Sequence, residues 1–385
     1  MGIRSETATE QRNGYNGRMD IDYLLFLQQL RESLGSVPES ILVTLSDFGG
    51  GAVVLGLCLL IYWGVDKQTG IFALMCFNVG NFVNQFLKNL ACVYRPWVRD
   101  PRVVPAPAAI DGATGYSFPS GHTVSTTTIF GSFTARTWNK RRWLSVICIC
   151  VIAIVAFSRN YLGVHTPQDV LVGLAEGIVV VIVGCKVAPW LHEHREKDWL
   201  IVALAFVLGA AVLVVINLKP YPMDYVDGVL LVDPEDMKKD CFEGVGLFCG
   251  AWLAWCCERR WVNFETAGAP PAERAIRVLF GLVLALAIMT ALDPMLKAVL
   301  GLNWAKLVSR FLLMLVTIFV GPWLAKLVID RRNRRTELVE APAVEVFGAE
   351  ETPSAGMSAA EAPAAETSAT TTPTLDRTPA DADTA

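Results

Sequence analysis

Two histidines, His122 and His165, lie in separate polar stretches whose other residues suit phosphate chemistry. The chain has only 4 histidines among 385 residues. An imidazole changes charge near neutral pH, and it serves as a nucleophile or as a general acid and base. The same stretches carry three cations, the start of a predicted helix and a carboxylate: Lys88, Arg95, Arg159, Ser120, Gly121 and Asp169. This set predicts phosphoryl transfer through a histidine.

The cations are spaced so that they can reach one phosphate. Lys88 and Arg95 are seven residues apart, about two helical turns, so both side chains can point to the same place. Arg159 ends a later apolar run. Three cations suit a dianion, and arginine adds two-pronged hydrogen bonding. The alternative is that each side chain extends from a helix end to the lipid headgroups.

Ser120 and Gly121 precede an apolar stretch that is predicted to be helical. A helix start has unpaired backbone N–H groups and a positive dipole end, and both favour phosphate. Gly121 lets the backbone approach an anion closely. The alternative is an ordinary serine N-cap and turn, but the adjacent His122 favours the phosphate interpretation.

Thr166 and Pro167 predict the start of a further helix, with Asp169 in its first turn. Asp169 can cap that helix, and it lies four residues beyond His165, close enough to accept the ring N–H. A carboxylate that orients an imidazole is what a nucleophilic histidine needs. One histidine would then attack phosphorus and the other protonate the leaving group. A divalent metal is the rival interpretation, but three converging cations would repel it.

The three blocks resemble the signature of the type 2 phosphatidic acid phosphatase (PAP2) superfamily, in its membrane-bound lipid phosphatase branch. They match Lys-x6-Arg-Pro, Pro-Ser-Gly-His and Ser-Arg-x5-His-x3-Asp over about residues 40–190. The resemblance implies a helical bundle and dephosphorylation through a phosphohistidine, without metal or cofactor. It makes His165 the nucleophile, Asp169 its orienting partner and His122 the acid and then the base. The phosphate oxygens would be held by Lys88, Arg95, Ser120, Gly121 and Arg159, while Ser158 serves the site or packing.

The composition predicts the elements that must position these residues. Hydrophobic residues make up 53% of the chain and charged residues 18%, and mean hydropathy is +0.42. Apolar runs of about 20 residues, the length that a bilayer core requires, recur along the sequence. We expect an all-α, polytopic membrane protein with about nine helices, give or take one or two: 42–64, 71–91, 121–137, 143–158, 169–190, 199–218, 242–257, 276–299 and 307–329.

Basic residues predict the orientation in the membrane, because cytoplasmic loops carry the lysine and arginine excess. Clusters near 140–142, 195–197, 259–277 and 331–335 fall on one side if the helices alternate. The opposite loops contain all three blocks, so the candidate site is expected at the outer face. The N-terminus would also lie outside, and the C-terminal tail in the cytoplasm.

Four regions are expected. Residues 1–40 form a polar segment with an interfacial amphipathic helix at 20–35, for which partner binding is the alternative. Residues 41–190 form the catalytic membrane domain, 191–335 are accessory helices, and 336–385 form a disordered tail. Most of the 10 cysteines lie inside apolar runs and are expected to be buried hydrophobes, although Cys92 and Cys241 could pair.

Polar residues at membrane depth add one hypothesis. Asn78, Asn81, Gln85 and Lys88 share a helical stripe, and Glu176 lies two turns beyond Asp169. Such residues usually face the bundle interior and are often functional. They are predicted to hold Lys88 in place, with hydrogen bonding between helices for packing alone as the alternative.

The leading function is a membrane phosphatase that hydrolyses a lipid phosphate or pyrophosphate. Candidate substrates are polyprenyl pyrophosphate, phosphatidic acid, phosphatidylglycerol phosphate and sphingoid phosphates. The alternatives are a phosphotransferase that uses the same phosphohistidine, and a transporter with a vestigial site. Membrane lipids are the expected surroundings, no nucleic-acid partner is expected, and the oligomeric state is open.

Overall fold

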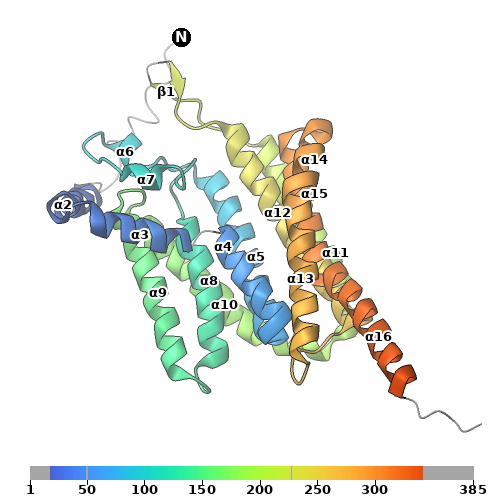
Figure 1. Cartoon of the computed structure of the whole chain (residues 1–385). Helices are drawn as coiled ribbons and strands as arrows, with labels where there is room; N and C mark the ends of the chain where they lie inside the picture. The colour runs from blue at the N-terminus through green and yellow to red at the C-terminus, as the bar shows by residue number, and fades with distance from the viewer. Residues whose placement is uncertain (1–17, 49–50, 227, 341–385) are drawn as a thin grey trace, which may run out of the picture. The chain divides into compact units, whose positions relative to one another are not determined.

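The chain is helical almost throughout, as its apolar runs predict. The structure is a computed structural model that describes residues 18–48, 51–226 and 228–340 (Figure 1). Its principal helices are α2 (Arg18–Leu34), α3 (Ser36–Phe48), α4 (Gly51–Leu60), α5 (Lys67–Ala91), α6 (Pro96–Arg99), α7 (Pro107–Ile110), α8 (Gly121–Thr137), α9 (Arg142–Tyr161), α10 (Pro167–Glu193), α11 (Asp198–Leu218), α12 (Pro234–Cys257), α13 (Pro271–Ala287), α14 (Asp293–Leu300), α15 (Leu302–Leu315) and α16 (Gly321–Glu340). Short π-helical turns at Ile61–Val65, Glu258–Val262, Ile288–Leu292 and Val316–Val320 extend four of them.

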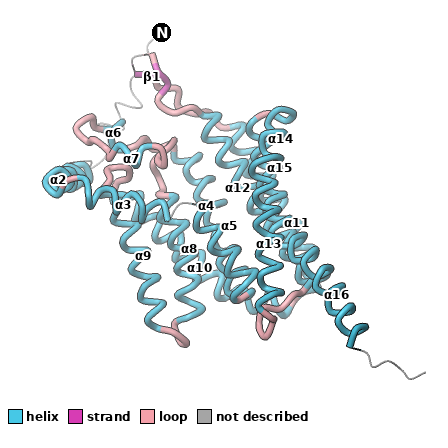
Figure 2. Tube along the Cα trace, viewed as in Figure 1, coloured by secondary structure: helices cyan, strands magenta, loops and turns pink. Residues whose placement is uncertain are grey.

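Strand structure is confined to one hairpin. β1 (Tyr225–Val226) pairs antiparallel with β2 (Val229–Leu230), with Tyr225 opposite Leu230. The rest of the described chain forms helices and loops (Figure 2). The predicted all-α class is therefore confirmed.

Six of the described helical stretches are long and apolar enough to cross a membrane, so the protein is a multi-pass membrane protein. They are Lys67–Arg99, Arg142–Tyr161, Pro167–Glu193, Arg195–Leu218, Pro271–Leu300 and Leu302–Arg335. The expected count of nine is not confirmed. α8 has 17 residues, and Val53–Val65 is a shorter apolar helix.

The predicted helix over 42–64 is wrong in its first part. α3 ends at Phe48 and α4 begins at Gly51, with residues 49–50 outside the described chain. α3 lies across the upper end of α9 in Figure 1 and contacts it. Three consecutive glycines, Gly49 to Gly51, stand at this point of the sequence, and glycine disfavours a continuous helix.

α2 has nearly the same bounds as the predicted amphipathic helix, but its apolar face packs against other parts of the protein. Ile21 and Leu24 are buried with Val103 from the loop after α5. Buried Arg31 donates to the backbone oxygen of Tyr161 at 3.1 Å and also to Val104 O. The helix thus holds a loop of the candidate site. The predicted polar segment before residue 18 and the tail from 341 lie outside the described residues, and α16 extends to Glu340, beyond the predicted start of the tail.

α5 is the central helix of the described unit, because it contacts α8 and α10 on one side and α11 and α12 on the other. Its start is capped by Asp66, whose side chain accepts a hydrogen bond from Thr69 N. Its end is marked by Cys92, which adopts a left-handed conformation at φ +48°. Lys88 therefore lies in the last turn, and Arg95 follows in the loop.

The accessory helices share a core with the helices before residue 190. Tyr62 and Trp63 are fully buried, and they donate hydrogen bonds to Ile318 O and Thr317 O, both at 2.9 Å. All 10 cysteines are free, so the alternative pairing of Cys92 with Cys241 is wrong.

One buried ion pair also joins these parts of the chain, and a second lies within the accessory helices. Lys67 Nζ lies 2.9 Å from Glu258 Oε1, and the Glu258 side chain is fully buried. Arg259 Nε donates to Asp198 Oδ2 at 2.8 Å. Removing one partner of such a pair leaves an uncompensated charge in an apolar interior.

We expect Lys67→Met to lower the free energy of unfolding by about 3–5 kcal/mol, because Glu258 loses its counter-charge. Lys67→Met combined with Glu258→Leu should restore much of that loss. Lys238→Met, which breaks an exposed pair with Glu235, should cost under about 1 kcal/mol. Thermal unfolding in detergent micelles compares the variants. A double variant that is no more stable than Lys67→Met would contradict this account.

Candidate active site

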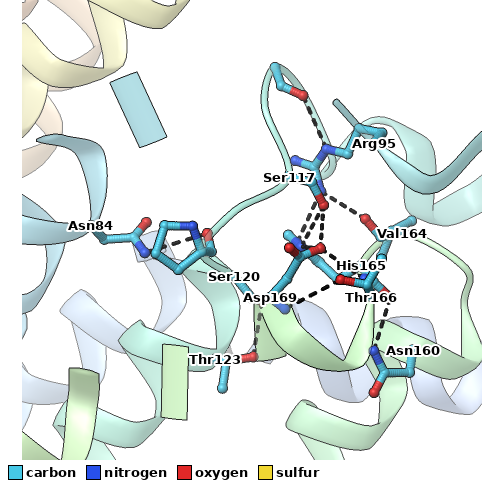
Figure 3. Close-up of polar contacts among 12 residues, drawn as sticks. Asn84, Arg95, Ser117, Ser120, Thr123, Asn160, Val164, His165, Thr166 and Asp169 are labelled. Atoms are coloured by element: carbon cyan, nitrogen blue, oxygen red, sulfur yellow. Dashed lines mark hydrogen bonds and ion pairs between the residues drawn. The ribbon is translucent and has the colours of Figure 1, made fainter. Parts of the chain in front are cut away.

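The site residues come from five segments that meet at one end of the bundle. The end of α5 supplies Lys88, the following loop supplies Arg95, and the start of α8 supplies His122. The end of α9 supplies Arg159, and the turn into α10 supplies His165. Figure 3 shows Arg95, Ser117, Asp169 and Thr166 gathered around His165.

Arg95 determines the protonation pattern of the His165 ring. Arg95 Nη1 lies 2.9 Å from His165 Nε2. A guanidinium only donates hydrogen bonds, so Nε2 must be the accepting nitrogen. The ring proton is therefore on Nδ1, and Nε2 carries the lone pair that a nucleophile needs.

Ser117 connects that ring proton to Asp169. Ser117 Oγ lies 3.3 Å from His165 Nδ1 and donates to Asp169 Oδ2 at 2.5 Å. The direct distance from Nδ1 to Asp169 Oδ2 is 3.5 Å, which is long for a hydrogen bond. Asp169 thus reaches the ring chiefly through the serine hydroxyl.

Asp169 also caps α10, so the two roles considered for it coexist. Its Oδ2 accepts from Thr166 N at 2.8 Å, and Thr166 Oγ1 accepts from Asp169 N at 3.4 Å. This reciprocal capping box, with Pro167 in the first turn, fixes the helix start. Because the cap is rigid, it also fixes the position of the carboxylate beside His165.

Arg95 and Arg159 are bound differently. Besides His165, Arg95 donates to three backbone oxygens, of Gly115, Val164 and Thr114, at 2.8–3.1 Å. Arg159 donates through Nη1 to Ser46 Oγ at 2.6 Å, while its Nε and Nη2 are buried and have no partner among the described residues. Arg159 is therefore ready to bind an anion, whereas Arg95 holds the loops and the nucleophile.

Lys88 lies beside the start of α8. A Cβ added to Gly121 would come within 3.6 Å of Lys88 Nζ and 3.3 Å of Asn84 Oδ1. Glycine thus leaves the lysine and the first helical N–H groups open to a common ligand. His122 is near enough to His165, Arg159 and Lys88 for their charges to interact.

The polar residues that were predicted to share one face of α5 contact two different sets of neighbours. Asn84, which the sequence analysis did not select, donates to Glu176 Oε2 at 3.4 Å and to Pro119 O at 3.5 Å. Asn81 and Gln85 instead line a cavity with α12, so these two do not join Glu176. Asn78 donates to Leu74 O within its own helix.

Two further predicted residues make local hydrogen bonds. Ser158 donates to Val155 O at 2.7 Å within α9, which fits packing rather than the site. Ser120 N donates to Asp169 O at 3.0 Å, and Ser120 Oγ accepts from Thr123 Oγ1. Ser120 therefore ties the start of α8 to the start of α10.

Comparison with known proteins shows the family. The model of the PAP2 superfamily matches residues 69–193, and that of the PAP2 superfamily phosphatase transmembrane extension matches residues 242–331. YbjG of Escherichia coli is 32% identical over 163 residues, 40% of this chain and 74% of that protein. The chain belongs to the PAP2 superfamily.

Other relatives of this PAP2 protein are more distant. An undecaprenyl-diphosphatase of Sulfolobus acidocaldarius is 27% identical over 166 residues, 43% of this chain and 74% of the relative. Lipid phosphate phosphatase delta of Arabidopsis thaliana is 26% identical over 152 residues. That alignment covers 36% of this chain and only 34% of the plant protein's length. No solved structure gives a significant match.

Ser117 and Asn84 are residues of the PAP2 region that sequence reasoning missed. The sequence signal that could have revealed Ser117 is its position three residues before Ser120, in the loop that leads into the Pro-Ser-Gly-His block. A serine has no distinctive spacing of its own, so only the fold reveals its contact. Among the described residues, no group of three or more histidine, cysteine, aspartate or glutamate side chains could hold a metal ion.

Burial and nearby cations keep His165 neutral. Desolvation, followed by the charges of Arg95, Arg159 and Lys88, lowers the pKa of the imidazole well below its ordinary 6.5. His165 Nε2 therefore remains unprotonated in mildly acidic solution. Because the unfolded chain takes up that proton more readily, the stability contribution of this group is lost as pH falls below 6.5.

We expect His165 to remain neutral, with its proton on Nδ1, at pH 6.5. Nitrogen-15 NMR of histidine-labelled protein between pH 8 and 6 measures this, and His165→Gln identifies the signal. A His165 ring that is half protonated at pH 6.5 would contradict the proposed electrostatics.

Proposed function

We propose that the protein is an integral-membrane phosphatase that hydrolyses a lipid phosphate or pyrophosphate through a phosphohistidine at His165. The observation that carries the proposal is the His165 ring, whose Nε2 is an acceptor and whose Nδ1 faces Ser117 and Asp169. The buried, unpartnered N–H groups of Arg159 support it, because a phosphate oxygen would satisfy them. The names of the relatives include lipid phosphate phosphatase and undecaprenyl-diphosphatase.

The reaction has two steps. Arg95 Nη1 turns from His165 Nε2 to a phosphate oxygen, which frees the Nε2 lone pair to attack phosphorus. A P–N bond forms and the P–O bond to the lipid breaks, while His122, in its imidazolium form beside the bound phosphate anion, protonates the departing oxygen. Water then attacks the phosphohistidine, His122 accepts its proton, and the P–N bond breaks to release inorganic phosphate. Asp169 stabilises the imidazolium through Ser117. Lys88, Arg159 and the N–H groups at Gly121 stabilise the charge on the phosphate oxygens, and Arg95 orients the ring.

We further propose that this site lies at the extracytoplasmic face. The site loops and the hairpin β1–β2 lie at the upper end of the described bundle in Figure 1. The basic clusters at 140–142 and 195–197 follow helices that run away from that end. An excess of arginine and lysine on the cytoplasmic side supports this orientation. The division into catalytic residues 41–190 and accessory residues 191–335, with a cytoplasmic tail, belongs to the same proposal.

Purified protein should release inorganic phosphate from lipid phosphates or pyrophosphates with EDTA present. His165→Ala should abolish release, because no other group supplies the nucleophile. His122→Ala should slow it and make an acid-labile phosphoenzyme easier to detect with 32P-labelled substrate. His192→Ala, in the last turn of α10 at the other end of the bundle, is the matched control and should remain active. Dependence on added Mg²⁺, or full activity of His165→Ala, would contradict the proposed mechanism.

Ser117→Ala should lower kcat about 10-fold to 100-fold, the range for a lost hydrogen bond to a charged group, with little change in KM. Ser132→Ala is the matched control, since Ser132 is a buried serine that donates only to Thr128 O of its own helix. Steady-state kinetics on one lipid phosphate separates the two parameters. If both variants behave alike, Ser117 has no positioning role.

A further inference from the structure

The accessory helices enclose, together with α4 and α5, a cavity that sequence reasoning did not anticipate. Its volume is about 440 Å³, within the usual range for small-molecule sites. Most of its walls are apolar. Representative lining residues are Leu55 and Leu59 of α4, Phe77 of α5, Leu247 of α12, Ala285 of α13 and Leu313 of α15. We call this cavity the chain pocket.

The chain pocket is elongated along the helices. On α5 its lining extends from Gln85 to Phe77, eight residues or ~12 Å of helix. On the α13 side, Leu282, Leu286 and Met289 line the pocket and are also 42%, 59% and 45% exposed. Since α13 belongs to a candidate membrane span, this side opens toward lipid. A flexible chain could enter from the bilayer without crossing the protein.

The polar end of the chain pocket adjoins the candidate active site. Gln85 lies one helical turn before Lys88 on α5. Asp240 and the paired Glu243 and Arg310, whose Nε–Oε1 distance is 2.9 Å, also line the pocket. Gln85 Oε1 is buried and has no partner among the described residues. The cavity therefore has one polar end beside the phosphate site and a long apolar body, the shape of an amphiphile.

Trp63, in the π-helical turn after α4, lines the pocket and is held in place by the accessory helices. Trp63 is fully buried, with its indole nitrogen bonded to Thr317 O. A Cβ added to Gly281 of α13 would come within 2.2 Å of the Trp63 ring, so glycine is required for this close approach. Across the pocket, a Cβ added to Gly56 of α4 would meet no atom within 4 Å. Gly56 thus faces open space.

We propose that the chain pocket binds the hydrocarbon chain of the lipid phosphate substrate while its phosphate lies at Lys88 and His165. The inference rests on the proposed phosphatase function and assigns the chain-binding role to the accessory helices. A bilayer is as apolar as the pocket, so transfer of the chain provides little binding free energy. The pocket instead selects by shape and fixes the phosphate relative to the nucleophile.

The test compares kcat/KM for a long-chain alkyl phosphate and for butyl phosphate in the same detergent. Gly56→Leu fills the pocket, so the ratio of kcat/KM for the long-chain substrate to kcat/KM for butyl phosphate should fall about tenfold. This is the lower end of the discrimination that an apolar pocket usually provides. Leu57→Phe is the matched control, because Leu57 is the next residue of α4, is 37% exposed and is absent from the lining. It adds bulk about 100° away around α4 and should leave the ratio unchanged.

Ala285→Phe on the facing wall provides a second variant, and thermal unfolding checks that each variant is folded. An unchanged ratio in both folded variants overturns the inference while leaving the phosphatase proposal intact.

Chain binding can also be measured without turnover. In His165→Ala protein, an alkyl phosphate with a diazirine near the chain end should label peptides of α4 and α13. Labelling confined to other helices overturns the inference even if no variant folds. If the wild-type protein releases phosphate from none of the substrates, the phosphatase proposal fails, and the labelling still decides whether the pocket holds a chain.

Discussion

The candidate site depends on one hydrogen bond, from Arg95 to His165 Nε2. An imidazole has two nitrogens and, when neutral, one proton. A partner that can only donate therefore determines where that proton lies. With Nε2 fixed as the acceptor, Nδ1 must donate toward Ser117 and Asp169. Loops from three places in the chain must therefore come together for both sides of the ring to be satisfied.

The cations around the His165 ring affect the free energy of the site in another way, through the cost of burying charge. Arg159 is 2% exposed and retains two N–H-bearing nitrogens without a described partner. Leaving such donors unmet in an apolar interior costs free energy, and an anion would recover it. The site is thus organised before a substrate arrives, which is how enzymes stabilise charge in a transition state. The same cations keep His165 neutral and hence able to attack.

The helices after residue 190 are joined to those before it by buried interactions. Tyr62 and Trp63 bond to backbone oxygens of the stretch after α15, and Lys67 pairs with Glu258. These contacts hold α4 and α5 in place on the side away from His165. They also create the chain pocket, whose walls come from both halves. The match of residues 242–331 to the transmembrane extension of PAP2 phosphatases fits a part that works with the catalytic helices.

Local signals in the sequence were enough to predict the all-α membrane class, the start of α10 at Pro167 and the residue types that gather at the site. Helix caps and apolar runs act over a few residues, so they can be read without a fold. The tertiary structure alone decided that Ser117 connects His165 to Asp169 and that Asn84 rather than Asn81 contacts Glu176. The helical period specifies which residues share a face, but packing decides which neighbour each face meets.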